Sequence, residues 1–254
     1  MALLGAADII DRSWEVVRRN LGQFLPIVLI FLVPSIAGTV AFEMLREQNL
    51  GIGPWQEAIL AIAIYVPLVA LSFLQTIALI RAVTAGIAGE PMPSLSDLLK
   101  MALPMVVPVF FASLALGVLL LAGLIVLVIP VIVMGVWFAF ILQAIVLDRA
   151  SWIGAFGASK SLVAGRFFPV LWRLVAPYVF WLLVSWVVTA LVVFLLNGAA
   201  GSFTVRVPEN APFWLTIAAN VATDSVGALM APFFLAVTTL LYLNLKAESG
   251  PPRT

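Results

Sequence analysis

MALPMVVPVFFASLALGVLLLAGLIVLVIPVIVMGVWFAFILQAIVL, residues 101–147, contains no Asp, Glu, Lys or Arg. As a continuous α-helix, these 47 residues would be roughly 70 Å long at about 1.5 Å per residue. The hydrocarbon core of a bilayer is about 30 Å thick, so this length fits two crossings and a tight turn. The stretch therefore predicts a protein that passes through a membrane more than once.

The composition of the whole chain points the same way. Of its 254 residues, 64% are hydrophobic and 10% are charged, against about 25% charged residues in soluble domains. The absence of cysteine and histidine removes the thiolate nucleophile, the commonest general base and the commonest transition-metal ligand. We therefore predict no catalytic residue, no metal and no cofactor. Residues 1–11 lack a basic start, so a cleaved signal peptide is not expected.

Polar residues recur at intervals that fit membrane crossings. The intervals 19–43, 57–81, 100–123, 123–148, 173–197 and 224–246 each measure 22 to 25 residues, about 33–38 Å of helix. These runs are apolar on all sides, unlike the alternating strands of a membrane β-barrel. The sequence predicts an all-α polytopic membrane protein. It has six transmembrane helices as three hairpins, each preceded by a cytoplasmic interfacial amphipathic helix.

Lys and Arg are unevenly divided between the two sides of these crossings. With the N-terminus inside, only Arg46 and Arg206 lie in outer segments. Eleven basic residues lie in inner segments: Arg12, Arg18, Arg19, Arg81, Lys100, Arg149, Lys160, Arg166, Arg173, Lys246 and Arg253. An excess of basic residues marks the cytoplasmic side of membrane proteins, so both termini are predicted to be cytoplasmic.

Internal similarity suggests one membrane domain, residues 1–254, built from pseudo-repeats at about 6–88, 94–149 and 151–247. The segment Leu74–Ala82 matches Leu142–Ala150 at six of nine positions. Each unit would consist of a surface helix and two crossings. In the first surface helix, apolar residues share one face: Ile10, Trp14, Val17 and Leu21. Shared packing rules of duplicated hairpins explain the similarity without any functional role.

Five stretches resemble a known family of membrane domains. They are 11–20, 129–132, 145–149, 155–171 and 240–246, which read DRSWEVVRRN, IPVI, IVLDR, AFGASKSLVAGRFFPVL and LLYLNLK. They are similar to the membrane domain fused to some bacterial glycerophosphoryl diester phosphodiesterases, which also occurs as a stand-alone protein. The resemblance spans essentially the full length of the chain and implies the fold and a place in the bacterial cytoplasmic (inner) membrane. It implies no catalytic residue, because the family's diesterase chemistry belongs to a separate domain.

Five polar residues stand out within or beside the predicted crossings. Gln75 and Gln143 each lie six residues before a basic residue, where an amide can bond a neighbouring helix or line a polar cavity. Asp224, with Asn197 and Asn220, could form a proton or ion site. The spacing instead favours a surface or capping role for Asp224, with residues 211–223 as a separate interfacial helix.

Six basic residues are candidates for contact with lipid headgroups: Arg18, Arg19, Arg149, Lys160, Arg166 and Arg173. Near an anionic membrane, each contributes about 1 kcal/mol of attraction. The alternative is that these charges only set the topology. Expected partners are membrane lipids, anionic ones included, and no nucleic acid. Small residues such as Ala78 and Gly86 leave a second copy or another membrane protein open as a partner.

The sequence favours a non-enzymatic role, as a lipid-associated or envelope-organising scaffold. The alternative is a small-molecule or lipid transporter with its pathway between the hairpins, since paired hairpins often frame such pathways. The hydroxyls near the expected midplane, Ser113, Ser185 and Thr189, can bond within their own helices, which weakens that alternative. An intramembrane hydrolase is opposed by the missing histidine and cysteine.

Overall fold

The computed structural model describes residues 4–47, 53–126, 128–201, 204–208 and 211–249, which form helices without any strand. Three short helices each precede a hairpin. They are α1 (Ala6–Arg19) before α2 (Leu21–Glu47) and α3 (Pro54–Ala88), α4 (Leu95–Ala102) before α5 (Val106–Val126) and α6 (Val128–Trp137), and α8 (Trp152–Val163) before α9 (Phe167–Ala199) and α10 (Phe213–Ser249). The 3₁₀ turn η1 (Leu103–Met105) joins α4 to α5, and α7 (Ile141–Asp148) continues α6, so that the second arm of the middle hairpin is divided into two short helices.

Six segments of the described chain are long and apolar enough to cross a membrane. They are Leu21–Met44, Trp55–Ala88, Leu95–Leu124, Ile129–Asp148, Phe167–Ala199 and Phe213–Ser249. The prediction of an all-α polytopic membrane protein is thereby confirmed. The separate helix expected at 211–223 is wrong, because α10 runs through Asp224 without interruption.

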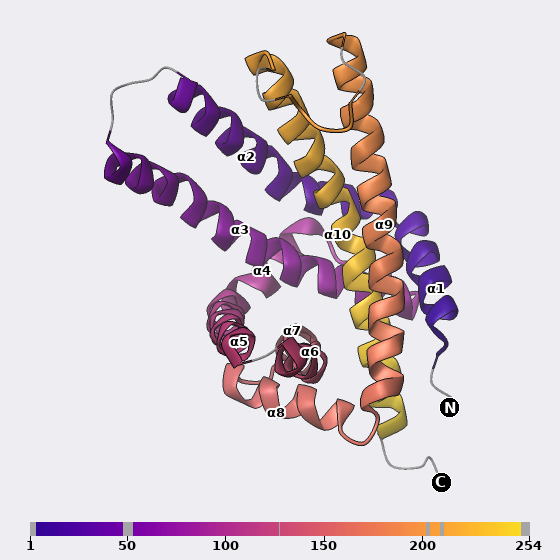
Figure 1. The fold of residues 1–254 in the computed structure, drawn as a ribbon. Coiled ribbons are helices and arrows are strands. Elements are labelled where there is room, and N and C mark those ends of the chain that lie inside the picture. The colour runs from indigo at the N-terminus through magenta and orange to yellow at the C-terminus, as the bar shows by residue number, and fades with distance from the viewer. Residues whose placement is uncertain (1–3, 48–52, 127, 202–203, 209–210, 250–254) are drawn as a thin grey trace.

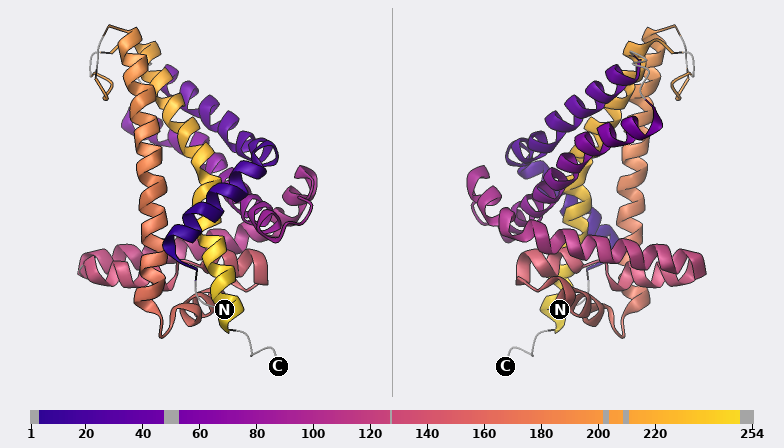
Figure 2. Two further views of the ribbon diagram at one scale, coloured as in Figure 1. Left: turned by 90° about the vertical axis from the view of Figure 1, so that its right-hand side faces the viewer. Right: turned by 90° about the vertical axis from the view of Figure 1, so that its left-hand side faces the viewer.

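The three hairpins diverge from one another. In Figure 1, α9 lies in the plane of the page, α2 and α3 slant away from it, and α5 and α6 are seen almost along their axes. In the views of Figure 2, α5 correspondingly runs across the direction of α9. The start of α1 and the end of α10 lie at the same end of the molecule (Figure 1). The interval pattern of the sequence did not predict this divergence.

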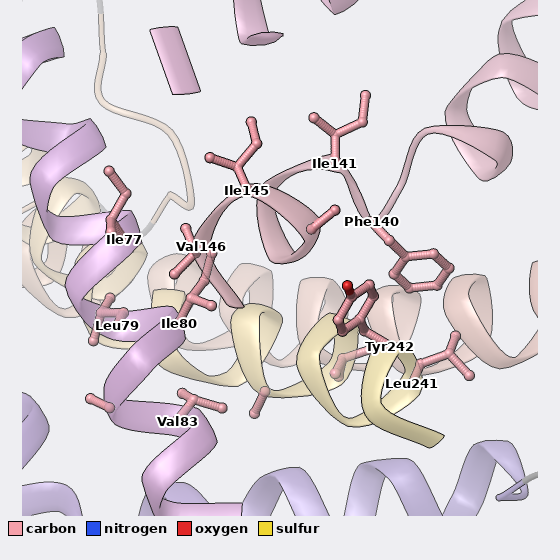
Figure 3. Packing of buried hydrophobic residues seen from close by; sticks show 14 of the residues in the cluster. Ile77, Leu79, Ile80, Val83, Phe140, Ile141, Ile145, Val146, Leu241 and Tyr242 are labelled. Carbon is pink, nitrogen blue, oxygen red and sulfur yellow. The ribbon is translucent and has the colours of Figure 1, made fainter. Parts of the chain in front are cut away.

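The buried core sits where the hairpins converge, a region we call the base. It comprises residues 77–83 of α3, 140–146 around α7 and 236–245 of α10, together with the buried faces of α1 and α8. Ile77 and Ile80 face Val146, and Tyr242 lies beside Phe140 (Figure 3). Away from the base the hairpins expose apolar side chains, as expected of surfaces that contact lipid.

Helix α1 packs on α9 and α10 through a face shifted from the predicted one. Ile9, Ser13 and Val17 are buried, whereas Trp14 is half exposed. The indole Nε1 of Trp181 donates a hydrogen bond to Ser13 Oγ at 3.0 Å, which attaches α1 to α9. The Ser13 hydroxyl in turn donates a hydrogen bond to the Ile10 carbonyl, so this buried group both accepts and donates.

Candidate functional site

The polar groups of the base gather at the ends of α3, α7 and α10. Asp148, the last residue of α7, accepts a hydrogen bond from the Tyr242 hydroxyl at 2.7 Å. Its other carboxylate oxygen forms an ion pair with Lys246, one turn further along α10. Two side chains of α10 thus neutralise and orient this carboxylate, which fixes the end of α7 on α10.

Arg81 lies on α3 beside the same end of α7. Its Nη2 donates to the Val146 carbonyl at 3.1 Å. The guanidinium also contacts the sulfur atoms of Met101 and Met105, at 3.8 and 3.6 Å. Its Nε is buried without a hydrogen-bond partner among the described residues. Arg81 is therefore held in place but retains donor capacity.

Arg81 and Arg149 line one cavity of about 380 Å³ between α3, α4, η1, the start of α5 and the end of α7. The rest of the wall is apolar and includes Met101, Pro104 and Ile145. No acidic residue is among those that line the cavity. Arg149 caps α7 at φ 55°, a left-handed conformation that favours glycine. Two cationic groups thus share a cavity without a carboxylate in its wall.

The fourth crossing is interrupted where α6 ends and α7 begins. Ser159 of α8 bridges this break: its hydroxyl donates to the Trp137 carbonyl at 2.7 Å and accepts from the Phe140 N–H at 3.1 Å. Lys160 sits over the Trp137 ring, 4.6 Å from its centroid. Buried backbone groups need such partners, so α8 is part of what stabilises the broken helix.

Both glutamines singled out in the sequence are buried. Gln143 Nε2 donates to Thr238 Oγ1 at 2.9 Å and so joins α7 to α10, while its Oε1 has no partner among the described residues. Gln75 Nε2 is also buried without a partner in that part of the chain. Thr238 and Tyr178 line a second, mainly apolar cavity of about 410 Å³ between α6, α9 and α10.

Among the predicted headgroup residues, some are engaged by distant parts of the chain and others are exposed. Arg166 is paired with Glu248 at 2.9 Å, and Arg173 donates to the Leu4 carbonyl at 2.7 Å. These two side chains bind Leu4 and the last turn of α10, so they have structural contacts of their own. Arg19 forms an exposed pair with Glu15, and Arg18 is exposed.

Asn197, Asn220 and Asp224 do not share contacts. Asn197 is buried and donates to the carbonyls of Thr204 and Arg206, at 2.8 and 3.0 Å, so it stabilises the loop after α9. Asp224 accepts a hydrogen bond from Thr39 at 3.2 Å, which links α10 to α2. Asn220 is partly buried.

The described part of the chain contains no cluster of three or more metal-ligating side chains. What the base offers instead is cationic and hydrogen-bonding groups at the ends of apolar helices. Such an arrangement can hold an anion at the membrane surface, because guanidinium groups bind oxyanions in a fixed geometry.

Arg81, Ser159 and Tyr242 were not among the predicted site residues. For Arg81 a signal did exist, because the internal match aligns it with Arg149. Ser159 and Tyr242 act through tertiary neighbours, and nothing in their local sequence distinguishes them from packing residues.

The fold and the base define a class, the polytopic α-helical membrane proteins with six candidate crossings. Within this class, the chain belongs to the DUF7847 family, a domain of unknown function whose model matches residues 58–245. No curated protein and no solved structure matches the chain. The resemblance to the diesterase-associated membrane domain stays a prediction, because the family found carries no such link.

Proposed function

We propose that the protein is a non-enzymatic, lipid-associated scaffold of the bacterial cytoplasmic membrane, with both termini in the cytoplasm. Its base would lie at the inner surface, in contact with anionic lipid headgroups. The hairpins would anchor it in the hydrocarbon core.

The distribution of basic residues carries this proposal. Arg12, Arg18 and Arg19 lie on α1, Lys100 on α4 and Lys160 on α8. Five further basic residues lie close to the base, near the ends of the long helices or in their connections: Arg81, Arg149, Arg166, Arg173 and Lys246. Arg206 lies in the loop between α9 and α10, at the far end of the hairpin. A basic, partly apolar end of a helical membrane protein is suited to anionic lipid.

The residue types of the chain support a role other than catalysis. The sequence contains no histidine and no cysteine. The acidic residue at the end of α7, Asp148, is paired with Lys246 and accepts a hydrogen bond from Tyr242. A general base needs a free, suitably placed acceptor, and this carboxylate is already engaged.

The orientation can be tested directly, because the chain has no cysteine of its own. Single cysteines would be introduced by Ser161→Cys in α8 and Arg206→Cys in the α9–α10 loop. We expect a membrane-impermeant maleimide to label position 206 in intact cells and position 161 only after permeabilisation. Labelling of position 161 in intact cells would contradict the proposed orientation.

Lipid association is tested in nanodiscs that contain phosphatidylglycerol in phosphatidylcholine. Native mass spectrometry would count the phosphatidylglycerol molecules that stay with the protein. The triple variant Arg18→Gln, Lys100→Gln, Lys160→Gln should retain fewer, and Arg206→Gln, the control at the far end, should retain the wild-type number. Equal retention by the triple variant and the wild type would refute association through the base.

Transport of a lipid or small molecule is the second candidate function. The break between α6 and α7 favours it, because interrupted helices often surround substrate sites in transporters. Gln143, whose Oε1 is buried and unpaired within the described part, lies just after this break. The protein would be reconstituted in liposomes, and the movement of a fluorescent lipid between the two leaflets would be measured. Movement that depends on the wild-type protein and is lost in Gln143→Leu would favour transport over scaffolding.

A further inference from the structure

We propose that the cavity between Arg81 and Arg149 binds a phosphate oxyanion, namely the headgroup phosphate of an anionic lipid or free phosphate. This inference rests on the proposed lipid association and names the site and the ligand class. Nothing in the family assignment specifies either of them.

The first step of the argument concerns charge. Both guanidinium groups line the same cavity, and none of the other residues that line it is acidic. The adjacent carboxylate, Asp148, is engaged by Lys246 and Tyr242 from α10. It is therefore not available as the main counter-ion of the arginine pair. Two like charges in one cavity repel each other, and a bound anion removes that repulsion.

The second step concerns the readiness of Arg81. Its guanidinium is fixed by the Val146 carbonyl and by weak contacts to two methionine sulfurs. Sulfur is a poor hydrogen-bond acceptor. The N–H groups of Arg81 that point at the two sulfur atoms therefore still lack a strong acceptor. An arginine positioned in this way can bind an oxyanion without first becoming ordered.

The third step concerns Arg149. A non-glycine residue at φ 55° is uncommon, and Arg149 is the one case among the described residues. A glycine would end α7 there with less backbone strain. Arginine at this position places an exposed cation in the cavity wall next to Arg81. Strain of this kind is often found where a side chain has a role in binding.

The fourth step concerns the position of the cavity in the membrane. The fourth candidate crossing ends at Asp148, so Arg149 directly follows the last residue of that apolar segment. The remaining wall consists of Met101, Met105, Pro104, Pro108, Ile145 and Ala150. A polar pair beside an apolar wall matches a headgroup phosphate with acyl chains alongside it. The volume, about 380 Å³, is ample for such a headgroup.

The test uses the purified protein in detergent micelles doped with either phosphatidic acid or phosphatidylcholine. Native mass spectrometry would measure the fraction of protein with one bound lipid. We expect saturable binding of phosphatidic acid, reduced roughly tenfold or more in Arg149→Gly, since a charge-assisted contact is lost. Because glycine suits the left-handed position, this variant should fold at least as well as the wild type. Arg81→Gln should weaken binding similarly, and the control Arg206→Gln, in the loop between α9 and α10, should bind like the wild type.

A second arm identifies the source of the phosphate. Inorganic phosphate would be added to the complex with phosphatidic acid, and to the lipid-free protein during thermal unfolding. Displacement of the lipid, with stabilisation that Arg149→Gly abolishes, assigns the site to free phosphate. Lipid binding that inorganic phosphate does not displace assigns it to the lipid.

The outcomes separate this inference from the proposed function. If Arg149→Gly and Arg81→Gln bind phosphatidic acid like the wild type, the cavity is not the site and the inference is wrong. The proposed lipid association would survive that result if the triple variant still loses phosphatidylglycerol in nanodiscs. If the triple variant also retains wild-type lipid, the proposed function fails as well.

Discussion

The two halves of α3 are both mainly apolar but have opposite surroundings. Near the base, Ile77, Ile80 and Val83 are 0% exposed, whereas Ile59, Ile62 and Val66 in the other half are 57%, 60% and 60% exposed. Both halves are apolar, so composition alone does not distinguish them. Apolar side chains therefore have two roles in this helix: at the base they pack against protein, and beyond it they contact lipid. The free energy of folding should therefore be concentrated at the base.

The largest expected effect comes from a void in the core of the base. Phe140 is fully buried and packs beside Tyr242, with ring centroids 6.0 Å apart. Phe140→Ala should lower the free energy of unfolding by about 3–5 kcal/mol, because it leaves a cavity that neighbours cannot fill. Leu121→Ala in the outer part of α5, where Leu121 is 65% exposed, should cost about 1 kcal/mol or less. The free energy of unfolding of both variants would be measured in mixed micelles. Equal decreases in the two variants would refute the contrast between the base and the exposed part of the hairpins.

A smaller effect is expected at the helix break. Ser159→Ala removes the group that satisfies the Trp137 carbonyl and the Phe140 N–H. Two buried backbone groups would then lack a partner, which should cost about 2 kcal/mol. Ser161→Ala is the matched control on the same helix, since its hydroxyl is exposed and bonds only the Ala158 carbonyl. A Ser159→Ala protein as stable as the control would show that the break does not depend on α8.

A third substitution probes a polar link outside the base. Thr39→Val breaks the hydrogen bond from α2 to Asp224 of α10 while keeping the shape of the side chain. The expected loss is about 1 kcal/mol, in the range measured for hydrogen bonds between membrane helices. Thr76→Val is the control, because Thr76 bonds only the Ser72 carbonyl of its own helix. A loss as large as that of Phe140→Ala would mean that the contact between α2 and α10 contributes as much to stability as the core of the base.

The smallest effect is expected for Gln143→Leu. This change removes the bond to Thr238 but also removes a buried oxygen without a partner. The two contributions oppose each other, so the free energy of unfolding should change by less than about 1 kcal/mol. Thr238 keeps its own bonds to the Phe234 and Leu235 carbonyls. A loss above 2 kcal/mol would instead identify Gln143 as an essential link between α7 and α10.

The number and approximate limits of the crossings were predictable, because transfer of an apolar helix into lipid depends on local composition. The directions of the hairpins were not, since these are set by contacts such as those of Trp181 with α1. Asp224 was misread as the boundary between two helices because a polar residue usually marks an end. Its partner Thr39 lies 185 residues away, and no local pattern indicates that contact.

The candidate site was predictable only in part. Arg149 and Lys160 were selected for their charge, and both line or adjoin the polar groups of the base. Arg166 and Arg173 have the same charge but are engaged by Glu248 and the Leu4 carbonyl. Charge can be counted from the sequence, whereas the engagement of a charge depends on which distant groups fold against it.

The divergence of the hairpins has a mechanical consequence for the surrounding lipid. Transmembrane helices usually tilt by up to about 40° from the bilayer normal. Because α5 runs across the direction of α9, the normal of one flat bilayer cannot be nearly parallel to the axes of both helices (Figure 2). Either the lipid around the protein thins and curves, or the hairpins swing toward one another on insertion. The energy stored in that adjustment would draw the protein toward regions of membrane that are already bent.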